Sequence, residues 1–450
     1  MTAKLLFFVA CLASTIAVAV SCSAPSTDDI VLVNHSYGEE WTTTPVSFDV
    51  ELSEALLTAA RENRLVLTGV SDHAEISVQL DKELNAHKFR ITALLPGGHT
   101  GKQEYQLTAK DKPAFSIIQA EPGQESAQPF ITEGNQKVLQ YNYEKVHAED
   151  VVRPGGEKKE LTYSEFSSGI YYEELLKSHP TYPKDTVLTG AVYGVPRSDY
   201  IHPLYGLNGE MLTRDWPDGG HPHHRGIFWA WPEVEYNGQR GDIYALQRVF
   251  ARPTGKIDFI SGPVYAQIYA ENRWMWEDEV PIVHEQVTIR AYRANDRQRI
   301  IDLTLEFQAL EENITLATRF TDSYGGLNIR MQTPEEQEIS YFTDEPGGSP
   351  SRAWADFNGI FEGNEAKSGL MILQHKSNPE YPGDWVEYPN LSWIQPTFPT
   401  PKSRYRLSLT EPLVLRYRFV VHAGGEPTPD VSKAYWDAYN SQNLPQVKDR

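Results

Sequence analysis

Three histidines and one arginine within five residues form the densest group of reactive side chains in this sequence: His221, His223, His224 and Arg225. In an extended chain, residues two apart share a face, so His221 and His223 can point into one cleft while His224 turns away. Imidazole exchanges protons near neutral pH and binds metals, and guanidinium holds anions. We therefore expect a catalytic or ligand-binding site here.

Two kinds of chemistry fit this segment, and its residue types do not separate them. One is a site for a divalent metal with imidazole and carboxylate ligands. The other uses the side chains directly as acid, base and anion holder, with His202 and Tyr205 upstream as further candidates. A purely structural loop, in which the imidazoles only satisfy backbone groups, is the third interpretation. The candidate metal ligands are His221, His223, Glu277 and His284.

Tryptophans close to this segment suit the recognition of sugars, because an indole offers a flat apolar face on which a sugar ring can stack. Further along the chain, an amide and a guanidinium two positions apart share one strand face, which suits sugar hydroxyls or a carboxylate. The candidate substrate-binding residues are Trp229, Trp231, Trp274, Trp276, Asn328 and Arg330.

Composition and missing motifs argue against several classes of protein. The net charge of −20 argues against a nucleic-acid partner, since such proteins need a basic face for phosphates. Two cysteines in 450 residues exclude a disulfide scaffold and a cysteine-cluster zinc site. The sequence also lacks four familiar motifs: GxGxxG, HExxH, GxSxG and the P-loop. It therefore gives no support to a dehydrogenase, a zincin protease, an α/β-hydrolase or a kinase.

Residues 1–21 have the pattern of an export signal, because Lys4 precedes a long apolar run that ends in small residues. The segment Ala-Val-Ser-Cys at 19–22 resembles a bacterial lipobox, which predicts lipidation of Cys22 and a polar tether over residues 22–29. Ordinary signal cleavage near the same place is the alternative. We expect an exported protein, either an outer-membrane lipoprotein that touches the membrane only through Cys22 or a periplasmic protein.

Alternation of apolar and polar residues predicts an all-β protein with two domains. Short strands within residues 30–125 predict a small N-terminal β-sandwich of accessory type, without a reactive cluster. Longer antiparallel strands within residues 130–450 predict a large β-sandwich with few helices. We expect one helix over residues 430–440, and an insertion over residues 144–185 that contains another.

The histidine-rich region resembles the PmoA-like domain family of unknown function, which carries a methane oxygenase label. The resemblance rests on residues 201–205 (Ile-His-Pro-Leu-Tyr) and 221–226 (His-Pro-His-His-Arg-Gly), and weaker similarity covers residues 130–439. The chain has no run of 18 apolar residues after the signal, so a membrane-spanning oxygenase subunit does not fit. The resemblance instead implies an exported protein of carbohydrate degradation, with an oligosaccharide dehydratase among its relatives.

These observations lead to the hypothesis of a carbon–oxygen lyase or dehydratase that acts on an oligosaccharide containing a uronic acid. Elimination beside a carboxylate needs a cation on the acid group, a base for the adjacent proton and an acid for the departing oxygen. The assigned groups are Arg225 and Arg330 as cations, His221 or His223 as base, and His202 or Tyr205 as acid.

Two other functions compete with the lyase hypothesis. A glycoside hydrolase needs a pair of carboxylates across the scissile bond. A non-catalytic, surface glycan-binding lipoprotein would use the aromatic residues but has no need of clustered histidines. The carboxylates available to a hydrolase are Asp215, Glu277, Glu285 and Asp356.

Overall fold

The computed structural model describes most of the chain after residue 29. The described ranges are 30–35, 43–97, 102–123, 128–147, 150–154, 196–216, 221, 223–321, 323–343, 352–440 and 446–449. The expected export signal, the tether with Cys22, and the helix expected within the insertion lie outside these residues. In the described residues, strands dominate and every strand pairing between named strands is antiparallel, so the expected all-β class is confirmed.

The N-terminal part forms one seven-stranded sheet. Its core contains apolar residues from both ends of the sheet, such as Phe48, Ile91, Leu67 and Leu107, because these side chains alternate with polar neighbours along each strand. In order across the sheet, the strands are β2 (Thr44–Glu51), β5 (Lys88–Leu95), β4 (Glu75–Glu83), β3 (Leu65–Gly69), β6 (Lys102–Ala109), β1 (Ile30–His35) and β27 (Gln446–Asp449).

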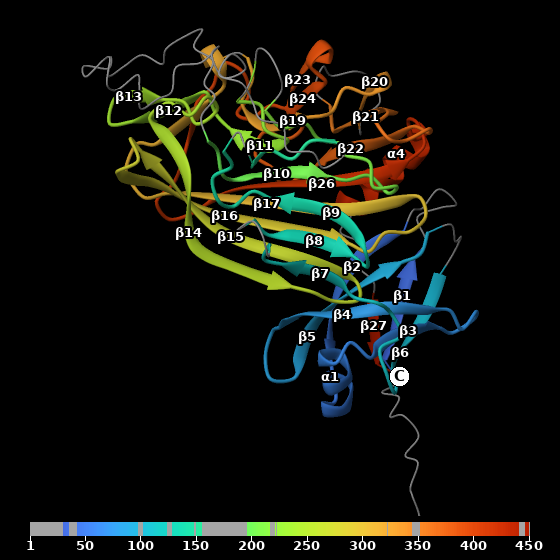
Figure 1. The fold of residues 1–450 in the computed structure, drawn as a ribbon. Coiled ribbons are helices and arrows are strands. Elements are labelled where there is room, and N and C mark those ends of the chain that lie inside the picture. Colours follow the sequence, from blue (N-terminus) through green and yellow to red (C-terminus); the bar gives the residue numbers. More distant parts are fainter. Residues whose placement is uncertain are drawn as a thin grey trace, which may run out of the picture.

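Three features of this part differ from the expectation. A helix, α1 (Glu54–Arg61), covers the core, and the Ser53 hydroxyl caps it by accepting from the Leu56 amide. Strand β27 brings the end of the chain back to pair with β1 (Figure 1). Strand β7 (Ile118–Glu121) pairs with β8 of the large sandwich, so the N-terminal unit stops before β7 rather than at residue 125.

The large sandwich consists of two eight-stranded sheets with a shared core (Figure 1). We call the first the site sheet. Its strands, in order, are β23 (Trp385–Tyr388), β24 (Trp393–Pro396), β19 (Gly326–Arg330), β11 (Ile227–Ala230), β10 (Tyr200–Leu204), β9 (Gln136–Tyr141), β8 (Phe130–Glu133) and β7. We call the second the long sheet. Its strands are β14 (Val249–Ile260), β15 (Tyr265–Trp276), β16 (Val280–Tyr292), β17 (Gln298–Ala309), β26 (Leu413–Ala423), β22 (Ser368–Gln374), β21 (Trp354–Ile360) and β20 (Glu335–Phe342).

The period-two pattern read from the sequence explains how the long sheet packs. On β17, Ile301, Leu303, Leu305 and Phe307 are buried, while the polar residues that alternate with them are only partly covered. Strand β26 alternates in the same way over residues 413–417 and is buried on both faces from there to residue 422, and Leu303 pairs with Tyr417 across the ladder. The apolar faces of both sheets therefore meet in one continuous core.

Smaller elements complete the fold. A four-stranded sheet contains β13 (Gln239–Gly241), β12 (Glu233–Tyr236), β18 (Thr315–Ala317) and β25 (Tyr405–Arg406). Two 3₁₀ turns, η3 (Arg319–Thr321) and η4 (Pro389–Leu391), follow β18 and β23. The expected C-terminal helix is confirmed as α4 (Pro429–Asn440), which packs through Tyr435 and Trp436. Among the described residues, no helix is long and apolar enough to cross a membrane.

The N-terminal sheet is fixed to the large sandwich by a buried glutamine. The Gln79 side-chain oxygen accepts the amides of Val264 and Tyr265 at 3.0 and 2.9 Å. A side chain at position 262 would collide with Gln79, so only glycine fits there. In Figure 1 this junction lies away from β11, β19 and β24, and it leaves that end of the site sheet uncovered by the N-terminal part.

Candidate functional site

The register of the site sheet brings the histidine segment next to the ends of two other strands. Strand β11 begins two residues after Arg225 and pairs with β19, where Ile227 lies opposite Ile329. The next residue of β19, Arg330, donates its amide to the Gly226 carbonyl at 2.8 Å and pairs with Trp393 of β24. Residues from three distant parts of the sequence therefore meet beside the imidazoles.

The three imidazoles form one cluster. The ring centroids of His221 and His224 lie 4.8 Å apart, those of His223 and His224 lie 4.7 Å apart, and those of His221 and His223 lie 5.7 Å apart. His224 is buried, whereas His221 and His223 are half-buried. His221 and His223 therefore lie close together, and His224 lies with them rather than turning away.

Aromatic side chains enclose this cluster. The hydroxyl of Tyr244 lies 3.3 Å from Nε2 of His224, and its ring is 5.5 Å from that of His223. The indole of Trp393 stacks on His224 with centroids 6.0 Å apart. Tyr324 contacts both Tyr244 and Trp393, at 5.0 and 6.1 Å. The imidazoles therefore have a phenol donor and a largely apolar wall around them.

This environment keeps the imidazoles neutral. Burial, followed by the charges of His221, Arg197 and Arg319, lowers the pKa of His223 to about 3. Burial also lowers the pKa of His224 well below its usual value. Burial and the nearby Arg330 lower the pKa of His221. The neutral imidazoles have a lone pair free at physiological pH, but their low pKa makes them weak bases, so a base role needs an anionic substrate beside them to raise that pKa.

Arg330 is the cation best placed to hold an anion at the cluster. Its side chain is buried, and its Nε and Nη1 groups have no hydrogen-bond partner among the described residues. Burial, followed by repulsion from Arg214, lowers the pKa of Arg330 to about 10, so it remains charged at neutral pH. A buried guanidinium with unused N–H groups is costly, and an anionic ligand would relieve that cost.

Comparison with known proteins places the site within a family. Residues 184–437, more than half of the chain, match a family of unknown function named DUF6807. The chain belongs to DUF6807. The matched region contains the histidine cluster, Tyr244, Arg330 and Trp393. No curated protein matches the chain.

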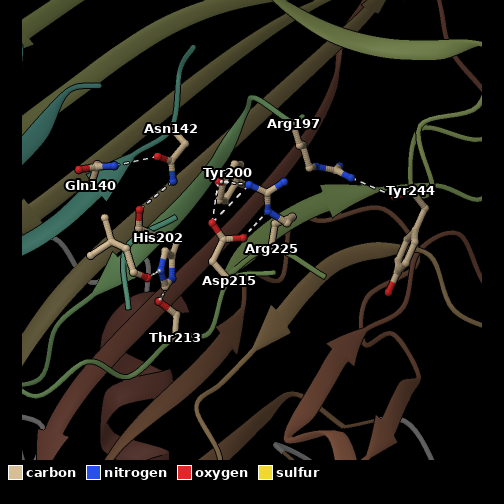
Figure 2. Close-up of polar contacts among 10 residues, drawn as sticks. Gln140, Asn142, Arg197, Tyr200, His202, Thr213, Asp215, Arg225 and Tyr244 are labelled. Atoms are coloured by element: carbon tan, nitrogen blue, oxygen red, sulfur yellow. Dashed lines mark hydrogen bonds and ion pairs between the residues drawn. The ribbon is translucent and has the colours of Figure 1, made fainter. Parts of the chain in front are cut away.

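In this DUF6807 chain, the expected anion-binding role of Arg225 is wrong. Arg225 is completely buried and forms an ion pair with Asp215, and its Nη2 donates to the Tyr200 hydroxyl at 2.7 Å (Figure 2). Its guanidinium also lies 4.4 Å from the Trp216 ring. A fully buried charge must be paired, and the charge of Arg225 is paired with Asp215 inside the fold, although its Nη1 has no hydrogen-bond partner among the described residues.

His202 is likewise structural, so the acid role expected for it is wrong. Nδ1 of His202 lies 3.0 Å from the Thr213 hydroxyl, and Nε2 lies 2.9 Å from the Val152 carbonyl (Figure 2). The same Thr213 hydroxyl accepts a hydrogen bond from the Leu204 amide. A carbonyl can only accept, so Nε2 carries the proton and Nδ1 accepts from Thr213. Both ring nitrogens are therefore occupied.

The four tryptophans expected to stack on sugars belong to the hydrophobic core of the large sandwich. Trp229 and Trp274 both donate their indole N–H to the carboxylate of Glu285, and Trp231 donates to the Phe398 carbonyl at 2.7 Å. Trp276 is also buried. Because the two sheets enclose these rings, they present no face to a ligand.

Asn328 and Tyr205 do not join the cluster either. The amide of Asn328 is buried, donates to the Gly326 carbonyl and accepts from Gln395, so it ties β19 to β24. Tyr205 is half-buried, and burial raises its pKa. Among the described residues, no ring contact joins Tyr205 to the imidazoles. Of the expected binding pair, only Arg330 lies at the cluster.

The expected metal ligands are not assembled. His284 lies on β16 and contacts Glu271 at 3.1 Å, and Glu277 lies in the turn after β15 beside Arg248. Both belong to the long sheet, whereas His221 and His223 precede β11 of the site sheet. Among the described residues, no three His, Cys, Asp or Glu side chains are arranged to hold a metal ion.

The carboxylates considered for hydrolysis lie in separate places. Asp215 is paired with Arg225, and Asp356 lies 2.8 Å from Nε2 of His422. Glu285 is buried in the core, where it shares a hydrogen bond with Asp199. Burial raises the pKa of both carboxyl groups of this pair. The pair is enclosed by the sandwich core rather than placed at the imidazoles.

Sequence reasoning missed four residues at the cluster: Tyr244, Trp393, Arg197 and Arg319. Each comes from a segment without a motif, and the tertiary fold brings it to the histidines, through the register of β24 for Trp393 and through loops and turns for the other three. The one available signal was compositional, namely the concentration of aromatic residues in the second half of the chain.

Proposed function

We propose that this DUF6807 protein is a carbon–oxygen lyase or dehydratase that acts on uronate-containing oligosaccharides. One observation carries the proposal: three neutral imidazoles and a tyrosine lie beside a buried arginine that has unused N–H donors. Elimination next to a carboxylate needs a base, an acid and a cation, and this cluster offers all three.

The chain's own residues can divide the steps between them. Arg330 binds the substrate carboxylate, which makes the adjacent C–H more acidic. Nδ1 of His223 has no partner among the described residues, so it can take that proton. The electrons of the broken C–H bond form a carbon–carbon double bond as the C–O bond breaks. The Tyr244 hydroxyl protonates the departing oxygen and replaces His202 and Tyr205 in that role.

The local charge supports an anionic substrate although the whole chain carries −20. Arg197, Arg319 and Arg330 are all close enough to the imidazoles to lower their pKa values. Fixed cations in a low-dielectric place dominate the potential nearby, whereas distant surface carboxylates are screened by salt.

The test is a digest of uronate-containing oligosaccharides, read by mass spectrometry and by ultraviolet absorbance of unsaturated sugars. We expect unsaturated products from the wild type. His223→Ala should lower turnover roughly 10²–10⁴-fold, which is the usual contribution of a general base. His284→Ala is the matched control, because His284 lies on β16 of the long sheet and its Nε2 contacts Glu271.

Other products would support the competing functions. Gain of water without a double bond would identify a glycoside hydrolase, and binding without turnover would identify a glycan-binding protein. A parallel digest with a chelator tests for a metal: loss of turnover that added metal restores would contradict the direct use of the side chains.

We also propose that the protein is exported and carries lipid on Cys22, because residues 1–22 have a signal followed by a lipobox-like cysteine. Metabolic labelling with a fatty acid should mark the wild type and leave Cys22→Ser unlabelled. Equal labelling, or none in either protein, would contradict lipidation.

A further inference from the structure

Phe320 is the most exposed large hydrophobic side chain of the described residues, with 63% of its surface accessible. It also has a left-handed backbone, with φ of 53° and ψ of 22°. Such a conformation is costly for a bulky non-glycine residue. A large aromatic ring that is mostly exposed in a strained backbone conformation is available for contact with a ligand.

The residues around Phe320 fix this turn next to the imidazole cluster. Arg319 contacts Asp242 at 3.2 Å, its amide donates to the Tyr324 carbonyl at 2.8 Å, and its charge lowers the pKa of His223. Tyr324 in turn contacts Tyr244. The Arg319 guanidinium lies 4.9 Å from the Phe320 ring, so the ring is supported at the edge of the cluster.

Tyr388 is a second exposed aromatic residue at the same cluster, with 39% of its surface accessible. Its ring lies 5.2 Å from that of Trp393, which stacks on His224. The hydroxyl of Tyr388 is near enough to raise the pKa values of Tyr244 and Tyr324, after the larger effect of burial. Tyr388 therefore ends a column of rings that starts at His224.

We infer that Phe320 and Tyr388 are stacking residues for the sugar units next to the reacting uronate. The apolar face of a pyranose ring packs on an exposed aromatic ring, which is the role that the buried tryptophans cannot fill. Two such rings on separate turns, η3 and the residue before η4, imply a substrate of several sugar units. The inference rests on the proposed function and specifies the substrate class of the same site.

The experiment compares Phe320→Ala and Tyr388→Ala with the wild type on uronate oligosaccharides of increasing length. For the longer substrates, each variant should raise KM by on the order of fivefold and lower kcat far less, because stacking contributes to binding of ground and transition states alike. For the shortest substrate the effect should be smaller. Leu409→Ala, an equally apolar and exposed position, is the control and should change nothing.

A third variant separates binding from structure. Phe320→Gly relieves the left-handed strain, so it should keep or raise Tm while it raises KM. A merely structural Phe320 would lower Tm instead. Unchanged KM in Phe320→Ala and Tyr388→Ala at every length overturns the inference.

Binding to immobilised uronate oligosaccharides distinguishes this inference from the proposed function. If the wild type binds these glycans without turnover, and both variants bind more weakly, the stacking inference is supported and the lyase proposal fails. If the wild type has turnover and the variants match it in KM and binding, only the stacking inference fails. If the wild type neither binds nor converts these glycans, both fail.

Discussion

The hydroxyl of Tyr244 lies 3.3 Å from Nε2 of His224, which links a loop before β14 to the segment that begins β11. Sequence separation hides this contact, because the two residues are twenty positions apart and a small hairpin lies between them. The pair connects the phenol directly to the imidazole cluster, and the first prediction depends on it.

Tyr244→Phe should lower turnover on uronate oligosaccharides by roughly 10²–10⁴-fold, because it removes the acid that protonates the departing oxygen. The ring remains, so the packing against Phe228 and Tyr324 should persist and the circular dichroism spectrum should not change. Tyr269→Phe on β15 is the control, since its hydroxyl contacts Glu271 on the long sheet. Equal loss in both variants would contradict an acid role for Tyr244.

Arg330→Gln should raise KM for uronate substrates by about 10–100-fold and should raise KM far less for their neutral methyl esters, because only the free acid needs a cation. The same variant should retain or raise Tm, since it removes a buried charge with unused N–H groups. Initial rates on both substrates and a thermal melt measure these effects. A matching loss on the esters would exclude carboxylate recognition by Arg330.

Arg225→Met should destabilise the fold by about 3–5 kcal/mol, because it leaves Asp215 as an unpaired buried charge. Denaturant unfolding measures this change. The double variant Arg225→Met with Asp215→Asn should recover part of the loss, which a catalytic role for Arg225 would not predict. If Arg225→Met unfolds like the wild type yet loses all turnover, Arg225 acts in catalysis after all.

The pH dependence of kcat/KM should have an acidic limb well below pH 6.5. The pKa of His223 is lowered to about 3, mainly by burial, so the neutral base persists as the pH falls through the usual histidine range. Rates measured from neutral pH down to the acid limit of folding check this. A limb centred on the usual histidine pKa would show that the base is a solvated imidazole elsewhere.

The buried pair of Asp199 and Glu285 should make the protein less stable as the pH rises. Burial raises the pKa of Asp199 from 3.8 to about 6, so the folded state favours the protonated form. The stability that this group contributes is fully present below pH 3.8 and is lost as the pH rises through about 6. Asp199→Asn cannot ionise, so its unfolding free energy should fall less over this interval.

Denaturant unfolding at several pH values measures the effect of this pair. Asp258→Asn, an exposed position on β14, is the control and should follow the wild type. Parallel curves for wild type and Asp199→Asn would mean that the pair does not titrate in this range.

Periodicity predicted long strands of the large sandwich such as β17 and β26, but it did not predict all of the strands in the two sheets. Alternation such as that of Ile301, Leu303, Leu305 and Phe307 places every second side chain in the core, and this holds whatever the partner strand is. The sequence did not predict α1 or the return of β27 to the N-terminal sheet. Helix α1 is only eight residues long, and strand pairing between chain ends leaves no local pattern.

The sequence by itself also determined where the reactive residues are concentrated along the chain, but the structure decided that all three imidazoles point to the same place. Only the tertiary structure decided which neighbours act with them. Arg225 pairs with Asp215, because a buried charge needs a partner. The tryptophans lie in the core, because large apolar rings avoid water. The register of β11, β19 and β24 brought Arg330 and Trp393 to the cluster, and register depends on pairing between segments far apart in the chain.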